Sequence, residues 1–170
     1  MLLIVTQAIF WMKIRIICVG KIKEAFFRDA IAEYVKRLSK FSIIEIVELQ
    51  DEKTPDKASP HEEELIKAQE AERLAKYISD KATVIALCIE GKEYDSVSFS
   101  KMIADYEISG ISHIQFIIGG SLGIYEELKK KAKGKLSFSK MTFPHQLMRV
   151  ILLEQIYRAY RIKNNEPYHK

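Results

Sequence analysis

The sequence predicts a single α/β domain built on a parallel sheet with helices on both faces. Short apolar runs typical of strands alternate with longer segments of helical periodicity along the whole chain. The strand runs are almost uniformly apolar, as in sheets that are covered on both sides. The length of 170 residues suits one domain, and neither an internal repeat nor a linker divides the chain.

The first half of the chain begins with a strand, a helix and a second strand. Lys13 to Gly20 and Ser42 to Leu49 have the apolar, β-branched composition of strands. Between them, Glu24 to Leu38 repeats apolar residues at steps of three and four, which predicts a helix.

A polar loop then leads to a second helix. Ser59, with a proline after it and Glu62 three residues later, forms a capping box that predicts a helix start. We expect this helix to reach about Ser79 and to carry four apolar residues on its inner face: Leu65, Ala68, Ala75 and Ile78.

The second half repeats the alternation. Thr83 to Gly91 and His113 to Gly120 are strongly apolar and predict central strands, with a short helix from Phe99 to Tyr106 between them. A glycine-containing turn and a helix follow over residues 121–134. Pro144 then predicts the start of a long helix, because the first turn tolerates a residue without an N–H.

The last helix is apolar on more than one side. The run Leu147 to Leu153 contains a single charge, whereas a surface helix shows only an apolar stripe. We therefore expect cover on two sides of this helix, one of them from another subunit.

Composition permits a nucleic-acid partner without requiring one, since the net charge is +4. The basic residues include one cluster of lysines, Lys129, Lys130, Lys131, Lys133, Lys135 and Lys140. A solvated helix face, with cations at the negative end of the helix dipole, is one interpretation. A surface that contacts phosphates is the other.

Metal, disulfide and membrane chemistry have little support in the sequence. Cys18 and Cys88 lie in apolar runs, which favours buried thiols over a disulfide or a metal site. No histidine spacing resembles a metal-ligand set, and no apolar run is long enough to span a bilayer. Of the histidines other than His169, only His145 lies near a candidate site, and its role stays open.

Two strand ends are candidate ligand sites, because ligands of open α/β sheets bind beyond the carboxyl ends of strands. They are Leu87 to Lys92 and Ile118 to Gly123. Paired glycines after a strand allow a ligand to approach the backbone closely, although a tight strand-to-helix turn would explain them equally well. The glycine spacing matches neither a dinucleotide fingerprint nor a Walker loop.

Several motifs together resemble one family. They are Met12-Lys13-Ile14, Val19-Gly20-Lys21, Phe116 to Ser121, Leu136 to Arg149 (LSFSKMTFPHQLMR), Glu154 to Ala159 and Pro167-Tyr168-His169-Lys170. The family is that of bacterial 23S ribosomal RNA pseudouridine N3-methyltransferases of the SPOUT class. The resemblance runs from Met12 to Lys170, and its combination of motifs is highly specific. Residues 1–11 lie outside it and read as an extension ahead of a natural start at Met12.

The resemblance implies a deep trefoil knot near the carboxyl end of the fold, a feature that is otherwise almost absent from proteins. It implies S-adenosylmethionine as cofactor, bound in the knot mainly by backbone groups and without a metal. Carried over by motif, the cofactor-binding residues are Leu87, Gly119, Phe138, Ser139, Lys140, Met141, Thr142 and Phe143.

The resemblance also implies a cytoplasmic homodimer that methylates N3 of a pseudouridine in 23S rRNA on the assembled ribosome. The cofactor would lie near the subunit interface with the carboxyl-terminal tail beside it. His169 or Tyr168 of the tail would act as a base or orient the target ring, and which of them acts stays open. A SPOUT enzyme acting on tRNA and a non-catalytic RNA-binding or nucleotide-binding module remain as alternatives.

A chain that starts at Met12 is expected to keep the melting temperature and cofactor affinity of the full chain, because residues 1–11 carry no targeting pattern and precede a complete domain. Thermal unfolding and ligand titration of both chains check this. A fall of several degrees in melting temperature would show that the segment packs on the fold.

Overall fold

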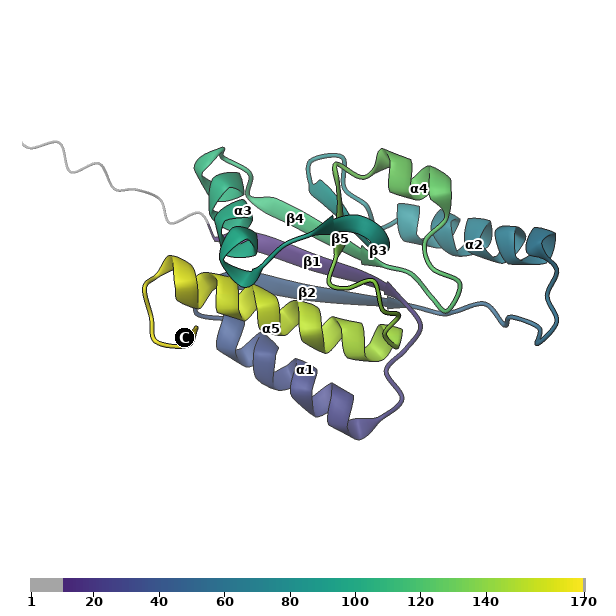
Figure 1. Cartoon of the computed structure of the whole chain (residues 1–170), viewed down its shortest axis with the longest axis horizontal. Coiled ribbons are helices and arrows are strands. Elements are labelled where there is room, and N and C mark those ends of the chain that lie inside the picture. Colours follow the sequence, from purple (N-terminus) through teal and green to yellow (C-terminus); the bar gives the residue numbers. More distant parts are fainter. Residues whose placement is uncertain (1–10, 170) are drawn as a thin grey trace, which may run out of the picture.

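The computed structural model describes residues 11–169, so Lys170 and all but the last residue of the expected extension lie outside the described part. Its five strands are β1 (Met12–Val19), β2 (Ser42–Leu49), β3 (Thr83–Glu93), β4 (His113–Ile118) and β5 (Gly134–Ser137). They form one parallel sheet in the order β2-β1-β4-β3-β5 (Figure 1). The helices are α1 (Ala25–Leu38), α2 (Pro60–Ala75), α3 (Ser96–Ile108), α4 (Glu126–Lys131) and α5 (His145–Lys163).

Both faces of the sheet are covered, as the uniformly apolar strands predicted. Along β1, Ile14, Ile16 and Cys18 join a core with buried residues of α1, α3 and α5. Ile17 and Val19 point to the other face and join a core with residues of α2 and α4. Because alternate residues of a strand face opposite sides, a strand buried on both faces must be apolar throughout.

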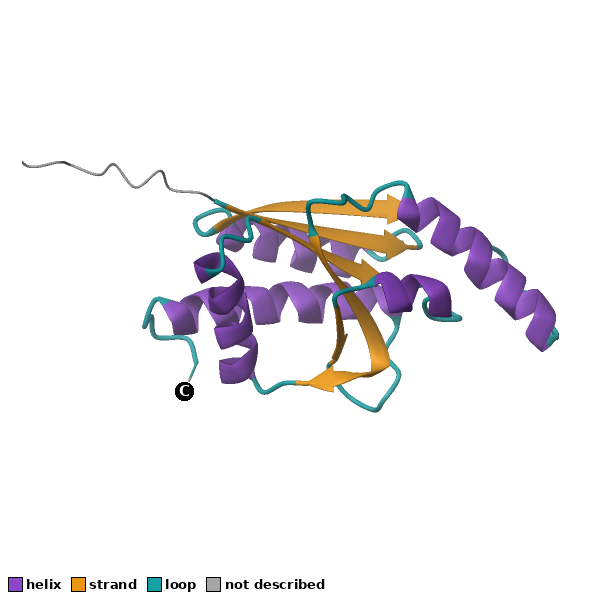
Figure 2. Cartoon of the chain, turned by 90° about the horizontal axis from the view of Figure 1, so that it is seen from above, coloured by secondary structure: helices purple, strands orange, loops and turns teal. Residues whose placement is uncertain are grey.

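Most predicted elements are confirmed. Helix α2 is present, but its end and its inner face differ from the prediction. Its capping box is present, with the Ser59 hydroxyl accepting from the Glu62 amide and the Glu62 carboxylate accepting from the Ser59 amide. The helix ends at Ala75, however, and the predicted inner face is wrong: Leu65 is 50% exposed. The reason is that the first half of α2 runs outward past the strand ends (Figure 2), so only its second half packs on the sheet.

Two further elements differ from the prediction. β5 was not predicted, because four residues with a glycine and a lysine carry no strand pattern. Helix α3 is longer than predicted and begins at Ser96, since the Asp95 carboxylate accepts a 2.6 Å hydrogen bond from the amide of Ser98 and caps the helix.

The start of α5 is fixed to the end of β1 by Arg149, whose side chain is fully buried. Its Nη2 donates to the carbonyl oxygens of Val19 (3.1 Å) and Gly20 (2.6 Å), and its Nη1 pairs with Glu48 Oε1 at 2.6 Å. The carboxylate balances the charge of the buried cation, and the three acceptors supply partners for both of its Nη atoms. The one charge in the apolar run of α5 is therefore its anchor.

The apolar run of α5 is covered within the chain from two sides. Leu152 and Leu153 are fully buried in the core, and α1 and α3 both pack against α5. Leu147, Val150 and Ile151 remain half-buried. Within residues 11–169, no helix combines the length and apolar character needed to cross a bilayer.

Arg149→Met is expected to lower the free energy of unfolding by about 2–4 kcal/mol, because it leaves two buried carbonyl groups and Glu48 without their donor. Chemical denaturation midpoints measure the loss. Lys101→Met is a matched control, since Lys101 forms an exposed pair with Asp105 on α3 and should change stability by less than about 1 kcal/mol. Equal losses in the two variants would contradict the anchoring role.

Candidate functional site

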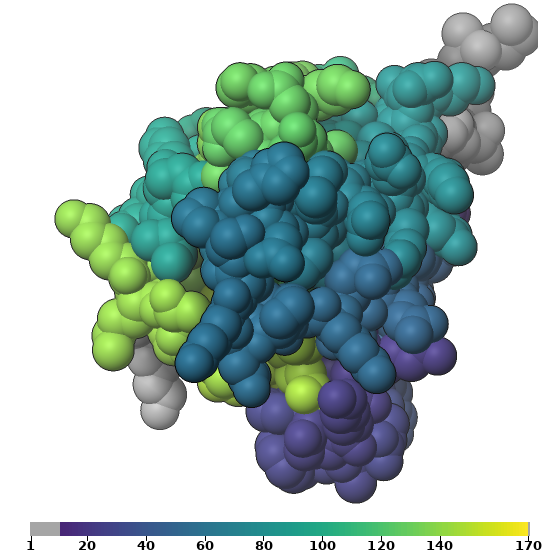
Figure 3. Space-filling model, turned by 90° about the vertical axis from the view of Figure 1, so that its right-hand side faces the viewer, coloured from purple at the N-terminus to yellow at the C-terminus, as the bar shows by residue number. Residues whose placement is uncertain are grey.

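A cavity of about 740 Å³ lies beyond the carboxyl ends of β3 and β4. Three stretches supply most of its wall, and these are Leu87 to Glu90, Ile118 to Ile124 and Leu136 to His145 apart from Lys140. Lys67 of α2, Lys129 of α4 and Met148 of α5 complete it. Figure 3 views this side of the molecule, with α2 in front and the segment around residues 138–144 next to it. The volume is within the range of small-molecule sites.

The first wall is a bend in β3. Leu136 of β5 pairs with Leu87 and again with Lys92, so the four residues between them leave the ladder. This bulge turns Cys88 toward the cavity, and the thiol is half-buried rather than part of the core. Cys18, by contrast, is buried as predicted, and both thiols are free.

The second wall is the turn Gly119–Gly123. A Cβ atom on Gly119 would lie 2.5 Å from the carbonyl carbon of Gly123, so no side chain fits there. Gly123 has a φ of +84°, a conformation that favours glycine. The two glycine positions thus shape a turn whose backbone faces the cavity directly.

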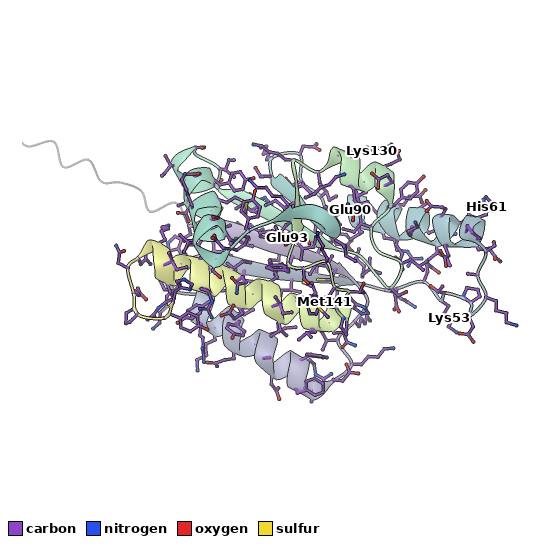
Figure 4. All side chains as sticks on the ribbon, viewed as in Figure 1. Lys53, His61, Glu90, Glu93, Lys130 and Met141 are labelled. Carbon is purple, nitrogen blue, oxygen red and sulfur yellow. The ribbon has the colours of Figure 1, made fainter. Side chains whose placement is uncertain are left out.

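The third wall is the segment between β5 and α5. Ser139 organises it, because its carbonyl oxygen accepts from the Ser137 hydroxyl and its own hydroxyl accepts from the Met141 amide, both at 3.0 Å. Phe138 packs toward Phe99 of α3, while Met141 is 71% exposed and projects near the start of α5 (Figure 4).

His145 closes the wall at the first turn of α5. Its Nε2 lies 2.7 Å from the place where a Cβ of Gly20 would be, and Gly20 has a φ of +88°. Burial lowers the pKa of His145, and the nearby guanidinium of Arg149 lowers it further. The imidazole is therefore neutral near pH 7 and able to accept a proton or a hydrogen bond.

Three of the six lysines of the cluster, Lys129, Lys130 and Lys135, pair with acidic neighbours. Lys129 bridges Glu90 and Glu126, and Lys130 pairs with Glu127 at 2.7 Å. Figure 4 shows Lys130 on α4 and Glu90 at the bend of β3. These pairs favour the interpretation as a solvated helix face over a surface free to contact phosphates.

The tail is packed on α5, away from the cavity of its own chain. The Tyr168 hydroxyl donates to Glu154 Oε1 at 3.1 Å, and its ring meets the Tyr157 ring edge-on at 5.0 Å between centroids. Burial raises the pKa of Tyr168 to about 12. His169 is exposed. Glu154 is six residues beyond Met148 of the cavity wall, roughly 9 Å along the helix axis.

The structure thus brings together seven of the eight residues predicted to bind the cofactor. Leu87, Gly119, Phe138, Ser139, Met141, Thr142 and Phe143 all line the cavity. Lys140 is exposed and is not part of the wall. Tyr168 and His169 do not line it either.

Sequence analysis missed one titratable group beside the cavity turn. Glu70 of α2 is 5% exposed and lies against Gly120 of the cavity turn. It stands in a polar stretch of the sequence. The capping box predicted where this helix begins, but it did not indicate which of its residues would be buried. No group of three or more possible metal ligands occurs within the described residues.

Comparison with known proteins assigns the class. A family model described as "Predicted SPOUT methyltransferase" matches residues 12–169, so the chain belongs to the SPOUT methyltransferase family and is an enzyme. It is similar to proteins named "Ribosomal RNA large subunit methyltransferase H". The one from Bifidobacterium adolescentis is 61% identical and the one from Streptococcus uberis 57%, each over 159 residues that cover 94% of this chain and all of the relative.

One solved structure supports the fold alone. It is titled "The structure of a probable methylase family protein" and comes from Haemophilus influenzae. It matches with a TM-score of 0.52 and 13% identity, covering 92% of this chain and 70% of that one.

His145 is expected to titrate below the ordinary histidine pKa of about 6.5, and NMR of the imidazole resonances against pH measures this. The unfolded chain then binds the proton first, so the contribution of His145 to stability is lost as the pH falls below about 6.5. His145→Gln should remove that part of the loss on acidification. A midpoint at or above 6.5 would contradict the burial argument.

Proposed function

We propose that this enzyme transfers a methyl group from S-adenosylmethionine to N3 of a pseudouridine in 23S rRNA, on assembled ribosomes. The observation that carries the proposal is the single cavity formed by seven of the eight residues that the family resemblance assigns to the cofactor. The names of the relatives supply the class of substrate, large-subunit ribosomal RNA. The catalytic domain in this proposal is residues 12–170.

The cavity suits this cofactor. Apolar side chains such as Leu87, Leu136 and Phe138 can enclose a purine ring, while the turn Gly119–Gly123 offers backbone donors and acceptors without side chains in the way. S-adenosylmethionine, when bound, supplies a methyl group already activated on a sulfonium sulfur. The protein has to bind it, hold the target base in line and remove one proton.

Removal of the proton on N3 of the target base has to be carried out by side chains of the protein. Because its pKa is about 12, Tyr168 keeps its hydroxyl proton at neutral pH, so it suits orientation of the target ring by hydrogen bonding or stacking. His169, whose imidazole is exposed, is then the better candidate for the base. His145, neutral and inside the cavity wall, is the next candidate.

The protein would act as a homodimer through the layer formed by α1 and α5. This layer holds many half-buried apolar side chains, and Phe26 of α1 is 63% exposed beside Phe27. A partner covering this layer would bury them. The tail lies too far along α5 to line its own cavity, so in the dimer it would serve the cavity of the other subunit.

The trefoil knot is part of the same proposal. Its support is the close approach of β5 to the bend of β3: a Cβ on Gly91 would lie 2.6 Å from the backbone of Leu136. Threading of one segment past the other would require such a close backbone contact.

Incubation of ribosomes with the protein and labelled S-adenosylmethionine, followed by mapping of the labelled nucleotide, tests the function.

Gly119→Ala should reduce cofactor affinity at least tenfold, because its Cβ must displace the Gly123 backbone and with it the cavity turn. Calorimetric titration measures it. The control is Gly110→Ala: Gly110 has open space around it and lies at the far end of α3, although its φ of +78° costs some stability. Equal affinities for Gly119→Ala and the parent would remove this turn from the site.

Deleting Tyr168 to Lys170 should leave cofactor affinity within about twofold and abolish methyl transfer, since the tail does not line the cavity of its own chain. Affinity and single-turnover methylation of ribosomes are measured together. Co-expressing the deletion chain with Gly119→Ala should restore part of the activity, because a mixed dimer keeps one intact tail beside one intact cavity. Activity in neither mixed nor deleted dimers would place the defect within one subunit.

A further inference from the structure

Glu70 is a buried carboxyl group that the proposed mechanism does not use. It is 5% exposed, and its Oε1 accepts a 3.0 Å hydrogen bond from the amide of Glu52. Its Oε2 accepts no hydrogen bond from residues 11–169, and no lysine, arginine or histidine among them forms an ion pair with it. A carboxyl group in this setting is costly to bury without a function.

The group lies directly behind the cavity turn. A Cβ on Gly120 would be 3.0 Å from Glu70 Oε2 and 3.2 Å from Oε1, so the carboxyl lies against the α-carbon of Gly120. Gly120 itself lines the cavity. Gly120 therefore contacts the carboxyl and also forms part of the cavity wall.

The carboxyl can change charge near neutral pH. Burial raises the pKa of Glu70 to about 7, with a further contribution from Asp51. Its charged neighbours on the segment after β2 are Asp51 and Glu52. On its own helix, Lys67 and Arg73 lie three residues away; Lys67 pairs with Glu64, and Arg73 is engaged by Glu52 and by the carbonyl of Gln50. The turn Gly119–Gly123 contributes no titratable side chain, and the residue of β1 that lies against Gly120 is Val19.

We infer that Glu70 is a specificity-determining residue that makes the cavity prefer the cationic cofactor over its neutral product. The inference rests on the proposed function. S-adenosylmethionine and S-adenosylhomocysteine differ in one methyl group and in the positive charge on sulfur. An unpaired, weakly solvated carboxylate beside the cavity stabilises a cation there and gives no such stabilisation to the thioether. The same charge would favour release of product after each transfer.

The linkage fixes the sign of the pH dependence. The cation binds better when Glu70 is ionised, so the preference is full above the pKa of Glu70 and is lost as the pH falls through it. The sulfonium also lowers the pKa of the amino group of S-adenosylmethionine relative to that of S-adenosylhomocysteine, so the two ligands titrate differently. This difference belongs to the ligands and is the same for every variant, so comparison of the parent chain with Glu70→Gln isolates the contribution of Glu70.

The test is calorimetric titration of the full chain with each ligand at about pH 6 and about pH 8, on either side of the pKa of Glu70. We expect Glu70 to make the ratio of affinities, cofactor over product, roughly threefold to tenfold larger at the higher pH. Glu70→Gln keeps the shape and the acceptor for the Glu52 amide, and its ratio should lack this part of the increase. Glu72→Gln, exposed on the same helix, should behave as the parent chain.

A folded Glu70→Gln protein that keeps the parent ratio and its pH dependence would overturn the inference and leave the proposed function intact. If that variant does not fold, Glu70→Ala takes its place, and a ratio with the parent's pH dependence in this variant would likewise overturn the inference. Failure of the parent to bind either ligand would overturn the proposed function itself, and the inference with it.

Discussion

The structure depends on one buried guanidinium. Arg149 donates to the last carbonyl oxygens of β1 and pairs with Glu48 of β2, so it links the first turns of α5 to two neighbouring strands. A buried cation cannot leave such acceptors without a large loss of free energy, so α5 can neither slide nor rotate. The segment just before α5 forms the third wall of the cavity, and its position follows from that anchor.

The cavity exists because backbones approach one another more closely than side chains allow. This happens at Gly119 against Gly123 and at Gly91 against Leu136. The first contact closes a sharp turn, and the second joins segments that are distant from one another in the sequence. A ligand bound here meets main-chain atoms on several sides, which explains how the site can work with few polar side chains.

The sequence was a good guide wherever local pattern decides structure. β1, β2 and β4 were predicted within about two residues because uninterrupted β-branched runs leave few alternatives.

The sequence was a poor guide where tertiary contacts decide the structure. Leu65 has helical spacing but faces solvent, because the first half of α2 extends beyond the ends of the strands. Arg149 resembles any charge on a helix until its acceptors are known. Glu70 has the same local surroundings as the exposed Glu72, and only the position of Gly120 distinguishes them. For the site, motif resemblance identified the loop residues, whereas the packing of the tail on α5 could not be read from the chain.

The core beneath α5 has a consequence for biosynthesis. Six buried residues of α5, from Leu152 to Tyr160, complete the core on one face of the sheet, and β5 completes its edge. All of them belong to the last part of the chain to leave the ribosome. At ordinary elongation rates of about 5–20 residues per second, roughly 7–27 seconds pass between the synthesis of β1 and that of Leu152. During that time only α1 and α3 can cover this face of the sheet, and a chain interrupted before α5 would leave part of the apolar core exposed.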